Sequence, residues 1–285
     1  MVSEHPSRAS LPEVISRVNR NSEGMDFMLR AGNVRAVGKY RKGGKLESFD
    51  AGGTLLFRKP RDLYLKLSYL TGSIEIGSNA QEWWVWNQVD NHYWWSQHGD
   101  IIQDSSLMGI PIRADHLVEI LGLSNLPIDT VGPHGPLYDV QPERFVLGYV
   151  DQDMAGQLYY TKWIAIDRFP PYLIRELYYF RPSGYREIAA FLSNYGPIDN
   201  TDGAAVMAPR KIRIEWLADE SWSELTFGGM RRFGQEQARR AENAYILESP
   251  RIRRRTDLGT VERVGAPPPA TLPATIPATG PSTEL

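Results

Sequence analysis

The sequence predicts a mainly β fold (α+β): a long antiparallel meander that curls, with one helix before it and one inserted in its middle. Short apolar runs with period-two alternation recur through residues 27–97 and 137–227, separated by turn residues. Apolar residues at helical spacing stand out in two short segments, 11–22 and 113–121. A chain of 285 residues is a normal size for one β-rich domain, and no second domain or exact repeat is visible.

The first helix is predicted over residues 11–22. Ser10 and Glu13 have the spacing of a capping box, and Pro12 lies in the first turn, where proline is tolerated. Apolar side chains follow at helical spacing and end near Gly24. The segment therefore has one apolar face to pack against the sheet.

Six strands are expected before residue 98. The turn sequence Lys42-Gly43-Gly44-Lys45 is typical of a two-residue β-hairpin, and Pro60 ends the second strand. Residues 63–68 alternate apolar with polar, which is the period of a strand. The expected strands are 27–41, 46–59, 63–68, 73–78, 82–87 and 92–97.

The second half continues the meander after the inserted helix. In that helix Leu117, Ile120 and Leu121 share one face, and Gly122 is a suitable stop. Residues 230–244 fit either a strand or a helix. The expected domain spans 11–264, between a flexible segment 1–10 and a disordered, Pro-, Ala- and Thr-rich tail 265–285. The expected strands are 137–149, 158–167, 172–180, 188–195, 211–217 and 221–227.

Composition excludes several classes of protein. A net charge of −2 gives no indication of nucleic-acid binding, and the absence of cysteine removes disulfides, thiolate metal sites and cysteine nucleophiles. No stretch approaches the roughly 18 consecutive apolar residues of a transmembrane helix. The first ten residues lack the apolar core of a signal peptide, so the protein is cytosolic or the sequence begins after a removed signal.

No catalytic or metal-binding pattern is present in the sequence. The five histidines have no metal-ligand spacing, and there is no nucleophile elbow, phosphate-binding loop or dinucleotide fingerprint. Paired carboxylates such as Asp151 and Asp153 fit solvated turns better than an active site. The basic run Arg251–Arg255 fits a solvated segment or a contact to phosphate or lipid headgroups. We therefore expect neither an enzyme nor a cofactor or metal.

Residues 81–97 hold five of the eight tryptophans. On a strand Trp84 and Trp86 share one face, while Trp83 and Val85 share the other, so both faces of this hairpin are aromatic. A sheet with one wet face should alternate apolar with polar. The tryptophans are therefore either core covered on both sides or the wall of an apolar pocket closed by the two helices.

A curled sheet with an apolar inner face needs filling, and two short helices fill it only in part. Hydrophobic ligands occupy the mouths of β-barrels, so a removable lipid is a natural filler. The residues expected to line such a cavity are Leu55, Phe57, Leu65, Leu67, Ile74, Ile76, Trp84, Trp86, Trp94, Leu117 and Leu121.

Two stretches resemble the LolA/LolB lipoprotein-carrier superfamily. Residues 53–67, Gly-Thr-Leu-Leu-Phe-Arg-Lys-Pro-Arg-Asp-Leu-Tyr-Leu-Lys-Leu, are similar to its second and third strands: a glycine, alternating apolar residues, a basic pair, a proline and an aromatic-apolar strand. Residues 76–87 resemble its next hairpin, which ends in an aromatic strand and Asn. Weaker likeness continues through 159–167, 172–179, 211–216 and 243–250, so that it covers about residues 11–258.

The resemblance implies an open antiparallel half-barrel capped by helices. The concave side would hold the acyl chains of a lipoprotein or lipid that crosses the periplasm. Partners would be a lipid or acylated lipoprotein and a lipoprotein-handling protein in the inner or outer membrane, and the protein would act as a monomer. Its location would be periplasmic, or attached to the outer membrane by an anchor that this chain does not show.

Two departures from the family pattern matter. The carriers read Lys-Arg-Pro, with the arginine holding the lid, whereas this chain reads Arg58-Lys59-Pro60. Lysine is a point donor and does not replace the arginine fork, so either Arg58 provides the lid latch from a shifted register or Arg58 and Lys59 together hold the closed form. The receptors of the family carry an N-terminal lipidated cysteine, which is missing here.

Two rival functions remain open from the residues. A carbohydrate-binding protein would use exposed Trp83, Trp94 or Trp95 as a stacking platform. A purely structural envelope protein would have these tryptophans only as core.

Overall fold

The structure is a computed structural model of the chain. It describes residues 8–98, 100, 114–127, 135–152, 156–199, 205–243, 248–250 and 258–264. The expected terminal segments 1–10 and 265–285, and the basic run Arg251–Arg255, therefore lie wholly or mostly outside the described residues.

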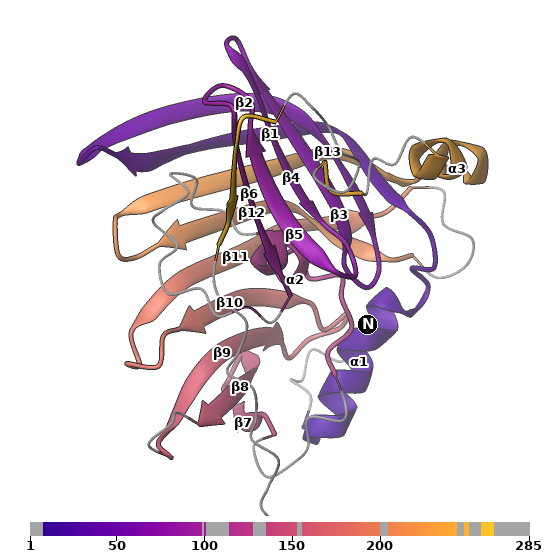
Figure 1. The fold of residues 1–285 in the computed structure, drawn as a ribbon. Coiled ribbons are helices and arrows are strands. Elements are labelled where there is room, and N and C mark those ends of the chain that lie inside the picture. Colours follow the sequence, from indigo (N-terminus) through magenta and orange to yellow (C-terminus); the bar gives the residue numbers. More distant parts are fainter. Residues whose placement is uncertain are drawn as a thin grey trace, which may run out of the picture.

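The predicted fold class is confirmed. All the strands of the described residues belong to one open sheet of fourteen strands, accompanied by three helices (Figure 1). The helices are α1 (Leu11–Glu23), α2 (Ala114–Ile120) and α3 (Gln235–Asn243). The strands are β1 (Leu29–Lys42), β2 (Lys45–Arg58), β3 (Asp62–Tyr69), β4 (Gly72–Ser78), β5 (Glu82–Asn87), β6 (His92–Gln97), β7 (Leu137–Val140), β8 (Arg144–Gln152), β9 (Leu158–Asp167), β10 (Ile174–Phe180), β11 (Arg186–Pro197), β12 (Met207–Trp216), β13 (Ser221–Arg232) and β14 (Thr260–Arg263).

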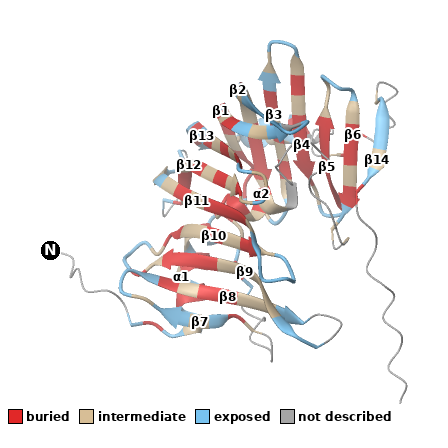
Figure 2. Cartoon of the chain, turned by 90° about the vertical axis from the view of Figure 1, so that its left-hand side faces the viewer, coloured by how far each residue is buried: buried red, intermediate tan, exposed pale blue. Residues whose placement is uncertain are grey.

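The sheet consists of two meanders rather than one. Its strand order is β14-β6-β5-β4-β3-β2-β1-β13-β12-β11-β10-β9-β8-β7, so the first strand of the chain lies in the middle of the sheet. The join is an antiparallel ladder between β1 and β13 that runs from Leu29–Arg232 to Lys39–Trp222. We call β2–β6 the first flank and β8–β12 the second flank. Figure 2 shows the sheet curving so that the two flanks face each other across α2.

Three local expectations were wrong or incomplete. Residues 137–149 form two strands, β7 and β8, because the chain turns at 141–143 and the backbone N–H of Gln141 bonds the carbonyl of Arg144 at 2.9 Å. The ambiguous segment 230–244 is divided between the end of β13 and helix α3. The stretch 243–250, which resembles the last strand of the family, begins with Asn243 as the final residue of α3, and its residues 244–247 lie outside the described part.

The fourteenth strand departs from the expected antiparallel pattern. β14 lies parallel to β6, with Thr260 opposite His92 and Arg263 opposite Trp95. Sequence periodicity gives no indication of this pairing, because four residues are too few for a pattern and the partner is far away in the chain. β14 covers the edge that β6 would otherwise leave open.

Helix α1 lies across one end of the sheet. The Glu13 carboxylate accepts hydrogen bonds from the backbone N–H of Ser10 at 2.8 Å and from its hydroxyl at 3.0 Å, as the capping sequence predicts. Val14, Ile15 and Val18 are buried in the main core. α1 therefore closes the end of the curved sheet with its apolar face.

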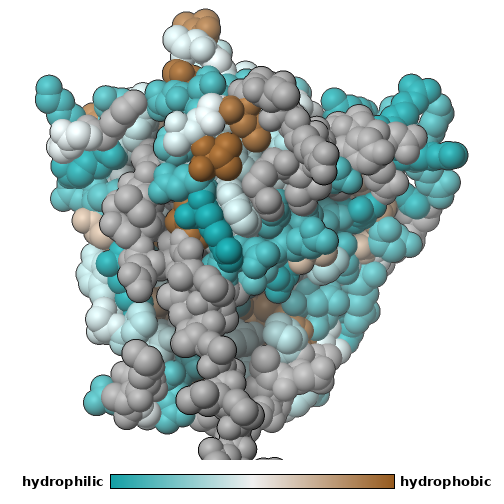
Figure 3. All heavy atoms as spheres, in the orientation of Figure 1, coloured by the Kyte–Doolittle hydropathy of each residue, from teal (hydrophilic) through white to brown (hydrophobic). Residues whose placement is uncertain are grey.

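Most of the core lies on the inner side of the curve. One continuous cluster joins α1, α2 and the inner faces of both flanks. A second, small cluster lies where α3 meets Met28 and Leu56, and a third lies on the outer face of β5 and β6. The described surface seen in Figure 3 is largely hydrophilic, with small, separate hydrophobic patches.

Candidate functional site

The inner face of the first flank is a continuous apolar surface. One row of side chains crosses five strands, because Leu55 pairs with Leu65, Leu65 with Ile76, Ile76 with Val85 and Val85 with Trp94. All five are buried. Seven of the expected lining residues lie on this face and in or against the main core: Leu55, Phe57, Leu65, Leu67, Ile74, Ile76 and Trp94.

The expected role of Trp84 and Trp86 in this surface was wrong. Both side chains lie on the outer face, in a separate cluster with Tyr93, against which Trp95 and Leu258 pack. The register decides the face, since Ile76 pairs with Val85 while Trp84 pairs with Gly77. The sequence showed that Trp84 and Trp86 share a face, but it did not show which one.

Gly77 explains how the outer tryptophan fits against the strand. A Cβ atom at this position would lie 2.1 Å from Cζ2 of Trp84, far inside any allowed contact. The indole ring therefore lies over a glycine on the neighbouring strand, and this close approach fixes Trp84 on the outer face.

The second flank has an apolar surface of the same kind, and none of its residues was among those expected to line the cavity. A matching row crosses five strands from Leu147 through Ile164, Leu177 and Ala190 to Ile214. All five are buried in the main core. The period-two alternation of these strands was visible in the sequence, but nothing in it showed that the two flanks face each other.

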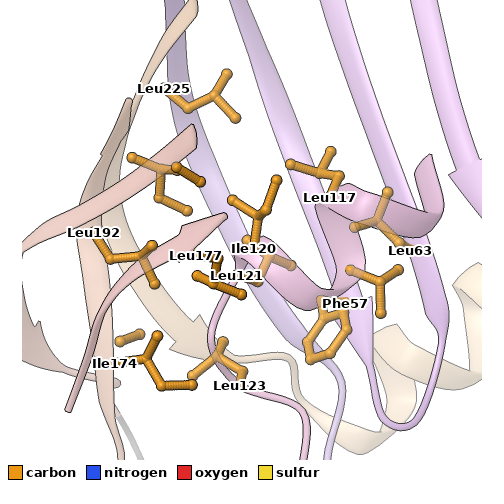
Figure 4. Close-up of a cluster of buried hydrophobic side chains, with 14 of the residues drawn as sticks. Phe57, Leu63, Leu117, Ile120, Leu121, Leu123, Ile174, Leu177, Leu192 and Leu225 are labelled. Carbon is orange, nitrogen blue, oxygen red and sulfur yellow. The ribbon is translucent and has the colours of Figure 1, made fainter. Parts of the chain in front are cut away.

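Helix α2 lies between the two flanks. Its side chains Leu117 and Ile120 are buried, and so are Leu121 and Leu123 just after its last residue. Figure 4 shows them between Phe57 and Leu63 of the first flank and Ile174, Leu177 and Leu192 of the second. Leu117 thus lies on the face of the inserted helix that packs against the sheet, and Leu121 lies in the same core just beyond the end of the helix.

A polar cluster joins α2 to the second flank. The Glu119 carboxylate accepts hydrogen bonds from Lys162 Nζ and from the Tyr179 hydroxyl, both at 2.9 Å. His116, one turn earlier, stacks on the Tyr179 ring at 4.4 Å. Lys162 Nζ also lies 4.8 Å from the centre of the Tyr149 ring. We call Glu119, Tyr149, Lys162 and Tyr179 the inner polar cluster.

The basic pair before Pro60 divides into two roles. Lys59 Nζ donates to the carbonyl of Ser22 at 2.5 Å and to Oδ1 of Asn125 at 3.3 Å, so it joins the end of α1 to the segment after α2. Arg58 instead pairs with Asp62 at 2.7 Å within its own hairpin. Burial lowers the pKa of Lys59, and the negative charges of Glu23 and Asp26 offset part of this effect by raising the pKa.

The same junction contains further hydrogen bonds. Asn19 donates to the carbonyl of Leu126 at 2.8 Å and accepts from its N–H at 2.7 Å. The Ser22 hydroxyl donates to Asn125 Oδ1 at 2.7 Å. Helix α1 is therefore fastened to the chain that leaves α2.

Two chemical alternatives can be tested on the described residues. They contain no group of three or more His, Cys, Asp or Glu side chains that could hold a metal ion. The carbohydrate platform was a wrong alternative for Trp83 and Trp94, because these residues are only 1% and 6% exposed.

Among the described helices, none is long and apolar enough to cross a membrane.

The fold resembles two solved structures at low sequence identity. A domain described as an outer-membrane lipoprotein-sorting protein from Vibrio parahaemolyticus has a TM-score of 0.57 and 12% identity, with 84% of this chain and 98% of that chain covered. A LolA superfamily protein from Nitrosomonas europaea has a TM-score of 0.50 and 10% identity, with 80% and 95% covered. No family model matches the chain, and no curated protein matches it by sequence. The chain therefore has the LolA-like fold that its sequence suggested.

Proposed function

We propose that the protein binds lipids or lipoprotein acyl chains between the two flanks of its sheet and transports them in the bacterial cell envelope, without catalysis. The observation that carries this proposal is the pair of facing apolar rows, with the short helix α2 between them among the residues that the structure describes. The similarity of the fold to that of a lipoprotein-sorting domain also supports a role in carrying acyl chains. The carrier works in the periplasm or at the outer membrane and receives its cargo from a membrane partner.

The energetics suit a carrier that must both load and release. Burying a 16-carbon acyl chain is worth about 12 kcal/mol gross, at about 0.8 kcal/mol per CH₂. Helix α2 and the residue that follows it bury Leu117, Val118, Ile120 and Leu121 in the same core. At about 1.5–3 kcal/mol each, displacing them costs about 6–12 kcal/mol. The two terms are similar, so an acyl chain can replace the helix without being trapped.

The experiment is lipid binding followed by native mass spectrometry and tryptophan fluorescence. The probe is a phosphatidylcholine with one dibrominated acyl chain, because bromine quenches only those indoles that it touches. We expect a lipid-bound species, and quenching that falls clearly in Trp94→Phe but little in Trp86→Phe. The two variants are matched, since both indoles are buried in the same hairpin and lie on opposite faces.

Two results would contradict the proposal. One is the absence of any lipid-bound mass with added or co-purified lipid. The other is equal loss of quenching in both variants, which would place the acyl chain outside the inner surface.

A further inference from the structure

We infer that the inner polar cluster is a binding site for an oxyanion, and that Glu119 occupies it when no ligand is bound. The inference rests on the proposed function and deepens it: the cargo is an amphiphile whose phosphate or carboxylate binds at Lys162, Tyr149 and Tyr179. Nothing in the apolar rows alone selects such a headgroup.

The three donors come from one row across three neighbouring strands. Lys162 on β9 pairs with Tyr149 on β8 and with Tyr179 on β10, so the three side chains leave the same face of the sheet side by side. Tyr179 belongs to the main core and Tyr149 packs against it. The row therefore faces inward, toward α2.

The occupant of this row is a carboxylate that belongs to α2. Lys162 and Tyr179 both donate to the same oxygen, Oε2 of Glu119. Ammonium and phenol groups that converge on one anionic oxygen would bind a phosphate or carboxylate oxygen in the same way. Because Glu119 is carried by the seven-residue helix α2, it leaves the row whenever that helix moves.

Tyr149 points to a ligand larger than the Glu119 carboxylate. Its hydroxyl is buried and has no hydrogen-bond partner among the described residues. Burial, with the negative charge of Glu119 added, raises the pKa of Tyr149 to about 12, so this hydroxyl keeps its proton at neutral pH. A buried donor without an acceptor is unfavourable, and an anion with several oxygens would satisfy it together with its two neighbours.

The side chains are accessible enough for exchange. Lys162 is 20% exposed and Glu119 is 43% exposed, so water reaches the pair at its rim while the apolar rows lie deeper in the core. An amphiphile could place its acyl chains among those rows and its headgroup at this rim. The apolar rows would thus bind the acyl chains, and the inner polar cluster would bind the headgroup.

The test measures affinity by calorimetry for three probes: dioctanoyl phosphatidylglycerol, dioctanoylglycerol and inorganic phosphate. The two lipids share their chains and differ in the anionic headgroup. Lys162→Met should weaken phosphatidylglycerol binding about tenfold and leave dioctanoylglycerol unchanged, because only the charged hydrogen bond is lost. Tyr149→Phe, which removes one hydroxyl, should weaken phosphatidylglycerol about threefold.

Two further variants make the result specific. Glu119→Gln should strengthen phosphatidylglycerol binding about threefold, because the internal competitor loses its charge. Lys211→Met is the matched control, since Lys211 on β12 also pairs with a glutamate at 2.9 Å and lies outside the main core. It should change neither lipid affinity.

The outcomes separate this inference from the proposed function. If both lipids bind equally, in the wild type and in Lys162→Met, the headgroup site is wrong and the acyl-chain carrier stands. Lys162-dependent binding of phosphate without lipid supports the oxyanion site for a free anion and contradicts the carrier. If none of the three probes binds, both are overturned.

Discussion

Lys59 carries the contacts expected of a lid latch. Its ammonium group joins the last turn of α1 to the segment after α2, two parts of the chain that the sheet alone does not connect. Arg58, by contrast, uses its Nε and Nη2 atoms to bond Asp62, four residues away in the same hairpin. We propose that Lys59 holds the helices in their closed position.

Exchanging either basic side chain for methionine tests this assignment. Lys59→Met should lower the free energy of unfolding by about 1–2 kcal/mol, because two hydrogen bonds of a charged donor are lost. Arg58→Met should cost less than about 1 kcal/mol, because this ion pair lies within one hairpin and is partly screened by solvent. Urea unfolding measures both. A larger loss of unfolding free energy in Arg58→Met than in Lys59→Met would mean that Arg58, and not Lys59, holds the helices closed.

The outer tryptophans show what the sequence could and could not predict about single residues. Period-two alternation correctly predicted that Trp84 and Trp86 share a face and that Trp83 lies on the other. The choice of face depends on contacts with the next strand, here Gly77 under the Trp84 ring. That contact is set by register, and a one-residue shift would exchange the two faces. For this reason the local pattern wrongly placed Trp84 and Trp86 among the residues expected to line the inner surface.

Strand β14 is held mainly by side-chain and edge contacts. His92 contacts Glu262 at 3.1 Å, and Arg263 pairs with Asp100 at 3.1 Å. Just beyond the strand, the backbone N–H of Val264 bonds the carbonyl of Trp95 at 2.8 Å, and Val264 is buried. Four residues thus cover the edge of β6 and border the outer aromatic cluster.

A shortened chain tests the role of this strand. A chain that ends at Asp257 loses β14 and should be less stable by about 2–3 kcal/mol, from one buried apolar side chain and the edge hydrogen bonds. It should also aggregate more readily, because β6 becomes an open edge. The control ends at Gly265 and keeps β14. Equal melting temperatures and solubility for the two chains would contradict this role.

The elements that the sequence predicted well are those with local signals. The capping sequence before α1 and the Gly43-Gly44 turn fixed their boundaries to within a residue or two. The break between β7 and β8 was missed because Pro142 and Glu143 interrupt an apolar run only briefly. The β1–β13 ladder and the parallel strand β14 join distant parts of the chain, and no local pattern specifies such a pairing.

At the scale of the whole molecule, the sheet and α2 differ in what holds them. The two flanks share a continuous ladder of backbone hydrogen bonds through β1 and β13. Helix α2 has seven residues, too few to be stable alone, so its position depends on apolar packing and on Glu119. Ligand entry should therefore move the helix and leave the sheet unchanged.

Hydrogen exchange with and without bound lipid tests whether α2 moves while the sheet stays in place. In the lipid-bound protein, amides of residues 114–120 should exchange at least about tenfold faster, because the acyl chain replaces the helix in the core. Amides of β1 and β13 should keep their protection, which makes them the internal control. Glu119→Gln should move the free protein part of the way toward the lipid-bound pattern, since it weakens the attachment of α2 to Lys162 and Tyr179. Slower exchange in 114–120 on lipid binding would mean that the helix tightens over the ligand, and displacement of α2 would then be the wrong route of entry.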